Sequence, residues 1–236
     1  MKKIAISQPT CLPWYGYFAL MDHVDEFVIL NDVQFDKRSW QSRNYIKSKD
    51  NKLLLSANVI TKGKFEQNIN EVRLTNYSNF TSKHLKSIEV NYRKTKYFNL
   101  YFNELKKIYS VKFTKLQDLN IAIIYKINDL LGIKKKIIFS SDLSFNNKFS
   151  KDEYLFQICK KINANIYIST IGAKKYLFKS KFFFNNNIKV MYFGMENFIY
   201  KQLNGKFIPN LSILDILFNE GQESLKILRK NFSLNE

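Results

Sequence analysis

The alternation of apolar and polar positions predicts strands and helices in turn from the start of the chain. Lys3 to Ser7 has the pattern of a short strand, and Phe27 to Leu30 is a continuous apolar run typical of a buried strand. Between them, the spacing of Phe18, Met21 and Val24 predicts a helix. A strand, a helix and a strand within roughly 30 residues form a βαβ unit.

The rest of the chain continues this alternation around a central helical block. Strand patterns cover 53–59 and 68–74, the period is helical from 82 to 132, and strand patterns return at 136–140, 166–169 and 188–191. Helices are predicted to begin at Ser150 and to cover 211–217. We therefore predict an α/β fold with a Rossmann-like, mostly parallel sheet and a helical insertion. The expected division is 1–78 and 134–236 for the α/β domain and 79–133 for the insertion.

Composition supports a folded protein without a membrane span. The 236 residues are 45% hydrophobic and 16% aromatic, which excludes intrinsic disorder. No apolar run approaches the roughly 18 residues of a spanning helix, and the N-terminus lacks the pattern of a signal peptide. Two cysteines imply neither a disulfide framework nor a cysteine zinc site. We expect a soluble, cytoplasmic protein.

The net charge of +18 would attract polyanions, which include nucleic acid, acidic membrane surfaces and phosphorylated metabolites. However, 33 of the 38 basic residues are Lys, and Lys, Asn, Ile, Phe and Tyr together are typical of AT-biased codon usage. The five arginines are therefore more informative. Arg38 and Arg43 lie close together, and a guanidinium offers phosphate a planar fork that an ammonium lacks. We predict an anion-binding segment here, with no specific nucleic-acid binding and at most transient association with a membrane surface.

The turn after the first strand, from Gln8 to Tyr17, is the first candidate site. Two prolines, a Trp and a Gly specify a rigid turn that leads into a helix N-terminus. Ligands of α/β sheets bind at the carboxyl ends of strands, so this turn can cradle a substrate or nucleotide, with Gly16 allowing its close approach. The alternative is a packed turn whose Trp14 and Tyr17 belong to the core.

Two further candidates also follow predicted strands. After Phe27–Leu30, Asp32 can act as a general base and Gln34 can orient a substrate, although Asn and Asp are also common in ordinary turns. Ser169 to Tyr176 can form an oxyanion or phosphate nest, although on sequence alone an ordinary helix capped by Ser169 or Thr170 is the simpler interpretation.

Other catalytic arrangements find little support. His23 and His84 stand alone, and no metal-ligand cluster, P-loop or GxGxxG motif is present. Cys11 lies in the first turn, but nothing near it in sequence would activate a thiolate.

These stretches resemble the WbqC-like family of bacterial proteins. The resemblance is carried by Gln8-Pro9-x-x-Leu12-Pro13-Trp14-x-Gly16-Tyr17-Phe18, by Asp32-Val33-Gln34-Phe35-x-Lys37-Arg38-x-Trp40-x-x-Arg43-Asn44-x-Ile46-Lys47, by Tyr167-Ile168-Ser169 with Ala173 and Tyr176, and by Phe207-x-Pro209-x-Leu211-Ser212-Ile213-Leu214-Asp215. It departs at Thr170-Ile171-Gly172, where family members often have Gly-Pro. Family members are typically encoded among surface-polysaccharide genes, such as O-antigen clusters, and their chemistry is poorly defined.

A more distant likeness concerns pantoate–β-alanine ligases and nucleotidylyltransferases. Their H-x-G-H helix start corresponds to Trp14-Tyr15-Gly16-Tyr17, and the ligases' N-P-x-Q-F corresponds to Asn31-Asp32-Val33-Gln34-Phe35. Both histidines that would contact ATP phosphates are missing here. The resemblance therefore implies a similar topology but leaves ATP-dependent adenylation in doubt.

The leading hypothesis is a transferase that adds an acyl or aminoacyl group to an amino sugar carried on a nucleotide. Asp32 and Gln8 are the catalytic candidates, and a coenzyme A or carrier-protein thioester is the conjectured donor, with no metal. The expected substrate-binding residues are Pro9, Trp14, Gly16, Tyr17, Gln34, Lys37, Arg38, Trp40, Arg43, Asn44, Lys47, Ser169 and Tyr176. An adenylate-forming ligase and a basic nucleic-acid-binding module are the alternatives.

Overall fold

A computed structural model describes residues 1–145, 149–195 and 198–235. Within these residues a six-stranded sheet has the order β5-β2-β1-β6-β7-β8. Neighbouring strands are parallel except for the antiparallel pair β7 and β8. The strands are β1 (Lys3–Ser7), β2 (Glu26–Ile29), β5 (Lys136–Phe139), β6 (Ile166–Thr170), β7 (Lys189–Gly194) and β8 (Ser233–Asn235).

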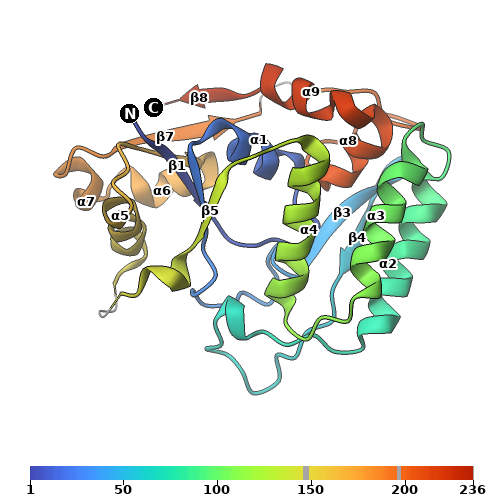
Figure 1. The fold of residues 1–236 in the computed structure, drawn as a ribbon, viewed down its shortest axis with the longest axis horizontal. Coiled ribbons are helices and arrows are strands. Elements are labelled where there is room, and N and C mark those ends of the chain that lie inside the picture. The colour runs from blue at the N-terminus through green and yellow to red at the C-terminus, as the bar shows by residue number, and fades with distance from the viewer. Residues whose placement is uncertain (146–148, 196–197, 236) are drawn as a thin grey trace.

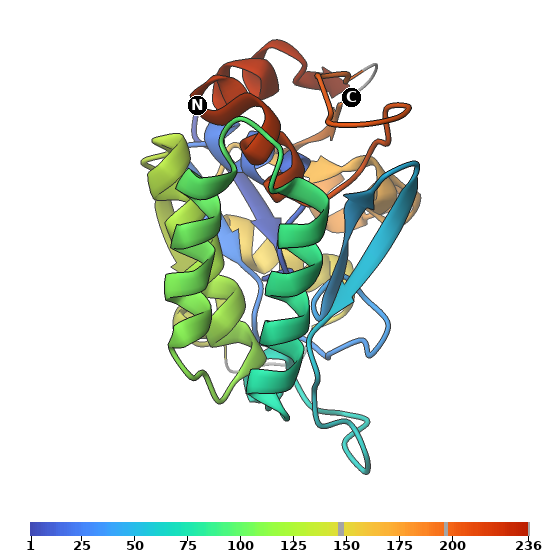
Figure 2. The same ribbon diagram turned by 90° about the vertical axis from the view of Figure 1, so that its right-hand side faces the viewer.

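Helices cover both faces of this sheet, and a two-stranded hairpin stands beside it (Figures 1 and 2). The hairpin consists of β3 (Arg43–Ser48) and β4 (Asn51–Ser56). The helices are α1 (Tyr15–His23), α2 (Tyr77–Tyr92), α3 (Phe98–Ser110), α4 (Leu116–Leu131), α5 (Lys151–Lys161), α6 (Lys174–Leu177), α7 (Lys181–Phe184), α8 (Ile213–Glu220) and α9 (Ser224–Lys230). Short 3-10 turns cover Ile69–Glu71, Ser140–Leu143, Ile171–Ala173 and Gly221–Glu223.

Alternate residues of the strands enter two separate cores. Ala5 and Phe27 join the larger core, which is built with α1 to α4, α8 and α9. Ile4, Ile6 and Val28 point the other way, into a smaller core built with α5 and α7. This two-sided burial explains why the strands read as continuous apolar runs.

The direction of chain growth reverses between β1 and β6. The chain proceeds from β1 through β2 to β5 on one side and then continues with β6 and β7 on the other. Ala5 of β1 is accordingly paired with Phe27 of β2 and with Ile168 of β6. The loops that leave β1 and β6 therefore diverge, and a crevice is expected at the carboxyl ends of these strands.

The predicted α/β class and mostly parallel sheet are confirmed, with several local differences; β8, α7 and α9 were not predicted. The stretch 68–74, predicted as a strand, contains a 3-10 turn, because Asn68 and Glu71 form a reciprocal capping box. The hairpin strand β3 was not predicted, since Arg43 to Ser48 is largely polar.

Helices α2, α3 and α4 account for the block predicted as an insertion over 79–133. Their buried side chains belong to the same core as the sheet residues Ala5 and Ile29. The division into a domain and an insertion stays a prediction. None of the helices among the described residues has the length and apolar character needed to cross a membrane.

Candidate functional site

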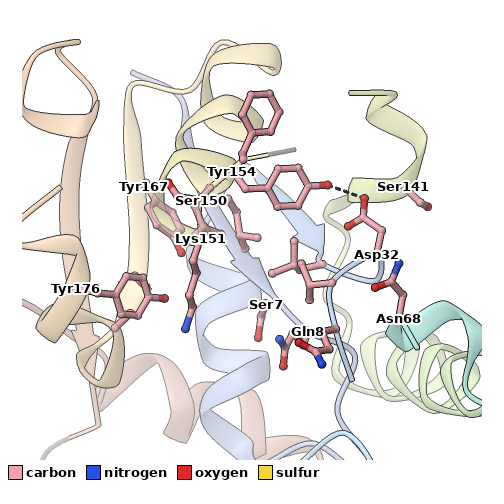
Figure 3. A pocket seen from close by; sticks show the side chains of 18 of the residues that line it. Ser7, Gln8, Asp32, Asn68, Ser141, Ser150, Lys151, Tyr154, Tyr167 and Tyr176 are labelled. Carbon is pink, nitrogen blue, oxygen red and sulfur yellow. Dashed lines mark hydrogen bonds between the residues drawn. The ribbon is translucent and has the colours of Figure 1, made fainter. Parts of the chain in front are cut away.

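A cavity of about 1250 Å³ opens at the carboxyl edge of the sheet, at the reversal between β1 and β6 (Figure 3). Ser7 and Gln8 at the end of β1, Asp32 after β2, and Ser169 and Thr170 of β6 contribute to its wall. The remaining described lining residues are Ile6, Thr10, Leu30, Val33, Gln34, Asn68, Ser141, Ser144, Phe145, Phe149, Ser150, Lys151, Tyr154, Leu155, Tyr167, Gly172, Ala173 and Tyr176. Gln8, Asp32, Gln34, Ser169 and Tyr176, which the sequence singled out, thus line one cavity at this edge of the sheet.

Asp32 is the one carboxylate among the described lining residues, and two hydroxyls fix its position. Its Oδ1 accepts a hydrogen bond from Ser140 Oγ, and its Oδ2 accepts one from the Tyr154 hydroxyl, each at 2.5 Å (Figure 3 draws the second). Burial raises the pKa of Tyr154, and its hydrogen bond to Asp32 raises it further. The phenol therefore stays protonated at neutral pH and donates to the carboxylate.

The loop that carries Asp32 is tied to the turn that follows β5. The Asn31 backbone N–H donates to Ser140 Oγ at 3.1 Å, and Asn31 Oδ1 accepts from the Ser141 N–H at 3.2 Å. Asn31 is buried, so these bonds also satisfy its polar groups. The sequence predicted that a strand ends near Ser140, but it did not show that this strand end lies beside Asn31. That contact depends on the parallel pairing of β2 with β5.

Gln8 is held in place by a residue that the sequence analysis missed. Gln41 is buried, and its Nε2 donates to Gln8 Oε1 at 2.8 Å. Asn120 of α4 supports both segments, since its Nδ2 donates to the Pro9 carbonyl and to the Gln41 carbonyl. Because Gln8 Oε1 accepts from Gln41, its Nε2 is the group available to donate to a ligand.

The remainder of the wall consists largely of hydroxyl and aromatic groups. Tyr154, Tyr167 and Tyr176 accompany the serines and threonines, and Gln34 and Asn68 add amides. Such a surface offers many hydrogen-bond partners to a polyhydroxylated ligand and ring faces on which it can stack.

Lys151 provides the one positive charge among the described lining residues. It occupies the first position of α5, after an N-cap where Ser150 and Glu153 form a capping box. Its Nζ lies 4.2 Å from the centre of the Tyr176 ring, on the side of the cavity opposite Asp32 (Figure 3). The sequence analysis predicted this cap but did not connect Lys151 with the site.

The first turn and the start of α1 are filled by their own aromatic side chains. Trp14 packs against Phe193, and Tyr17 is 3% exposed in the core. A Cβ atom on Gly16 would lie 2.3 Å from the Trp14 ring, so this glycine makes room for the indole. Of the residues predicted in this turn, Gln8 lines the cavity, whereas Pro9, Trp14, Gly16 and Tyr17 do not.

The predicted anion-binding segment likewise does not contribute to the cavity lining. Lys37, Arg38 and Trp40 are exposed, and an Nη2–H of Arg43 donates to the Arg38 carbonyl. Asn44 is buried, and its Nδ2 donates to the carbonyls of the first turn. Asp32 and this segment were both expected to contact the substrate, but only Asp32 lines the cavity.

Lys47 does not line the cavity and is engaged by other partners. It is 3% exposed, and its Nζ donates to Gln202 Oε1 and to the carbonyls of Asn204 and Lys206. These acceptors lie more than 150 positions away in sequence, so no local pattern indicated them. With its donors already used, Lys47 has a structural role in this conformation and is not placed to hold a substrate phosphate.

Cys11 and the two histidines do not form a catalytic or metal site. Burial raises the pKa of Cys11 to about 12 and lowers that of His84 to about 4. His23 stacks on Phe232 at a ring distance of 4.0 Å. No group of three or more metal-ligating side chains occurs among the described residues.

Comparison with known proteins agrees with these motifs. The model of the WbqC-like protein family matches residues 8–227. This chain belongs to that family. It is also 36% identical over 231 residues to the uncharacterized protein Rv1507c of Mycobacterium tuberculosis (strain ATCC 25618 / H37Rv), a match that covers 97% of this chain and 98% of the relative. No solved structure matches the chain.

Proposed function

We propose that this WbqC-like protein is a transferase of bacterial surface-polysaccharide biosynthesis. Its acceptor would be an amino sugar carried on a nucleotide, and its donor an acyl or aminoacyl thioester of coenzyme A or of a carrier protein. The observation that carries the proposal is the cavity at the β1–β6 reversal, with its hydroxyl-rich wall and a single described carboxylate and ammonium. The polysaccharide context rests on the family resemblance.

In the proposed reaction, Asp32 is the general base. It accepts a proton from the sugar amine or hydroxyl as that group attacks the thioester carbonyl, which forms a C–N or C–O bond. The C–S bond then breaks, and the leaving thiolate takes up the proton that Asp32 accepted, which regenerates the carboxylate. The hydroxyls of Tyr154 and Ser140 hold the carboxylate in a fixed position for this step.

Gln8 and Lys151 have complementary roles in this proposal. The Gln8 amide would donate to the carbonyl oxygen as negative charge develops there, and Gln41 fixes its orientation. Lys151 would contact a phosphate of the nucleotide, because it is the described cation on the cavity wall. Tyr176 beside it offers a ring face to the base or the sugar.

The ligase alternative receives less support from the geometry. The helix start that corresponds to the ATP-binding motif of the ligases is occupied by the indole of Trp14 over Gly16. Trp14 and Tyr17 stand in place of the two histidines; Trp14 packs against Phe193, and Tyr17 is 3% exposed in the core.

A transfer assay with Asp32→Asn tests the proposed function. Purified protein is incubated with nucleotide amino sugars and acyl-coenzyme A donors, and the released thiol and the acylated sugar are measured by absorbance and mass. Loss of the base should reduce the rate by about 10²–10⁴-fold. Asp129→Asn, on the exposed surface of α4, is the matched control and should keep the full rate. An active wild-type enzyme with an equally active Asp32→Asn variant would contradict the assignment.

A further inference from the structure

Three large apolar side chains protrude from one edge of the molecule. Ile171, Phe178 and Phe184 are 50%, 78% and 89% exposed, and they lie on or beside α6 and α7. These two short helices form one end of the molecule, beside α5 (Figure 1). A cluster of exposed apolar side chains is uncommon on a monomeric protein and marks an interaction surface.

An apolar hollow of about 470 Å³ lies among these side chains. Phe178 and Phe184 line it together with Ile188, Val190 and Tyr192 of the β7 region. The two phenylalanines therefore stand at the border of a hollow whose wall contains further apolar side chains.

The charged side chains within the segment that carries this cluster have one sign, and Asp152 of the neighbouring α5 interacts with Ser180. The sequence from 171 to 195 contains five lysines and no Asp or Glu. Lys175, Lys179 and Lys181 are exposed, and they flank Phe178 and precede Phe184 along the chain. Aromatic and aliphatic side chains interspersed with lysines are typical of segments that enter the interface of an anionic bilayer.

We propose that residues 171–190 form a lysine–phenylalanine surface that docks on an anionic lipid bilayer. Phe178 and Phe184 are its most exposed apolar side chains. The phenylalanines would enter the headgroup region while the lysines contact lipid phosphates. The segment has no Arg to form a bidentate contact with nucleic-acid phosphates, and its exposed phenylalanines border an apolar hollow, so the pattern favours a bilayer over nucleic acid.

Docking here would bring the cavity to the membrane surface. Tyr176 belongs to α6 and lines the cavity, and Thr170 and Gly172 precede the same helix (Figure 3 labels Tyr176). The bilayer-facing segment is thus continuous in sequence with the cavity wall. This inference does not depend on the proposed transferase activity.

Vesicle co-sedimentation of the 236-residue chain tests the proposal. Vesicles of phosphatidylcholine with phosphatidylglycerol are compared with vesicles of phosphatidylcholine alone. Because the net charge of +18 draws the whole protein to any anionic surface, the decisive variant leaves charge unchanged. Phe178→Ser with Phe184→Ser should lower partitioning onto the anionic vesicles by at least about tenfold per side chain.

Matched controls separate this surface from general attraction. Val90→Ser with Leu100→Ser removes two exposed apolar side chains from α2 and α3 at the opposite end of the molecule, and should leave partitioning unchanged (Figure 1). Lys175→Glu with Lys179→Glu should weaken binding more than the same charge change at Lys83 and Lys86 of α2.

A Phe184→Trp variant gives a readout at the surface itself. Its added indole emission should shift to shorter wavelength with anionic vesicles, relative to the same titration of unsubstituted protein. The proposal is overturned if unsubstituted protein does not bind anionic vesicles, or if the double phenylalanine variant binds as well as the Val90 and Leu100 control.

Discussion

Removing the Tyr92 hydroxyl should destabilise the fold strongly without affecting ligand binding. The phenol is buried, donates to Asp215 Oδ1 at 2.7 Å and accepts from the Lys47 backbone N–H at 2.7 Å. Tyr92→Phe keeps the ring contact with Phe218, at a centroid distance of 5.0 Å, and so isolates these two bonds.

The magnitude follows from the two bonds. A hydrogen bond to a charged acceptor contributes about 1.5–3 kcal/mol, and a buried N–H left without a partner costs about 1–3 kcal/mol. Together they give an expected loss of about 3–5 kcal/mol for Tyr92→Phe. Burial raises the pKa of Asp215, and the phenols of Tyr200 and Tyr92 oppose that rise, so removing Tyr92 should raise this pKa further.

Urea unfolding followed by circular dichroism measures this loss as a lower midpoint at constant slope. Tyr125→Phe, on the exposed surface of α4, is the control and should change the free energy of unfolding by less than about 0.5 kcal/mol. A loss below about 1 kcal/mol for Tyr92→Phe would refute the reasoning. Weakened ligand affinity in a fully folded Tyr92→Phe protein would instead connect the Lys47 region with the substrate.

Two further predictions concern a buried histidine and the choice of phosphate contact. Burial lowers the pKa of His84 from 6.5 to about 4, so the unfolded chain binds the proton first, and stability should fall by roughly 2 kcal/mol between pH 7 and pH 5. His84→Gln should remove this part of the pH dependence in urea titrations, and an unchanged slope would contradict the assignment. Lys151→Met should weaken nucleotide-sugar binding about tenfold or more in calorimetry, whereas Arg38→Lys should have little effect, because only Lys151 lines the cavity. The reverse order would restore the arginine segment as the anion site.

The parts of the fold that were predictable are those in which burial sets a local pattern. The two-sided burial of β1 and β2 makes Ile4 to Ile6 and Phe27 to Ile29 continuous apolar runs. Gln8, Asp32 and Ser169 were each chosen because they follow a predicted strand, and parallel strands share one carboxyl edge, where all three line one cavity.

The parts that were not predictable depend on partners distant in sequence. Whether Trp14 faces a ligand or covers Gly16 is decided by packing against Phe193, almost 180 positions later. From its sequence neighbours, Lys47 was predicted to bind phosphate. In the fold, its Nζ instead donates to carbonyls of the 202–206 loop. Gln41 was overlooked because its contact with Gln8 joins residues 33 positions apart and leaves no local pattern.

Binding of a panel of nucleotide sugars to protein whose cavity is blocked tests whether this cavity is the substrate site. Gly172 lines the cavity, and a Cβ atom there would meet nothing nearer than Thr170 Oγ1 at 4.0 Å, so Gly172→Trp should fold and fill the space. At a concentration of 100 Kd, a bound nucleotide sugar should stabilise the unsubstituted protein and a Lys83→Trp control by about 2.7 kcal/mol in thermal-shift measurements. We expect Gly172→Trp to lose this stabilisation. No stabilisation by any nucleotide sugar, or equal stabilisation of Gly172→Trp, would contradict the proposed site.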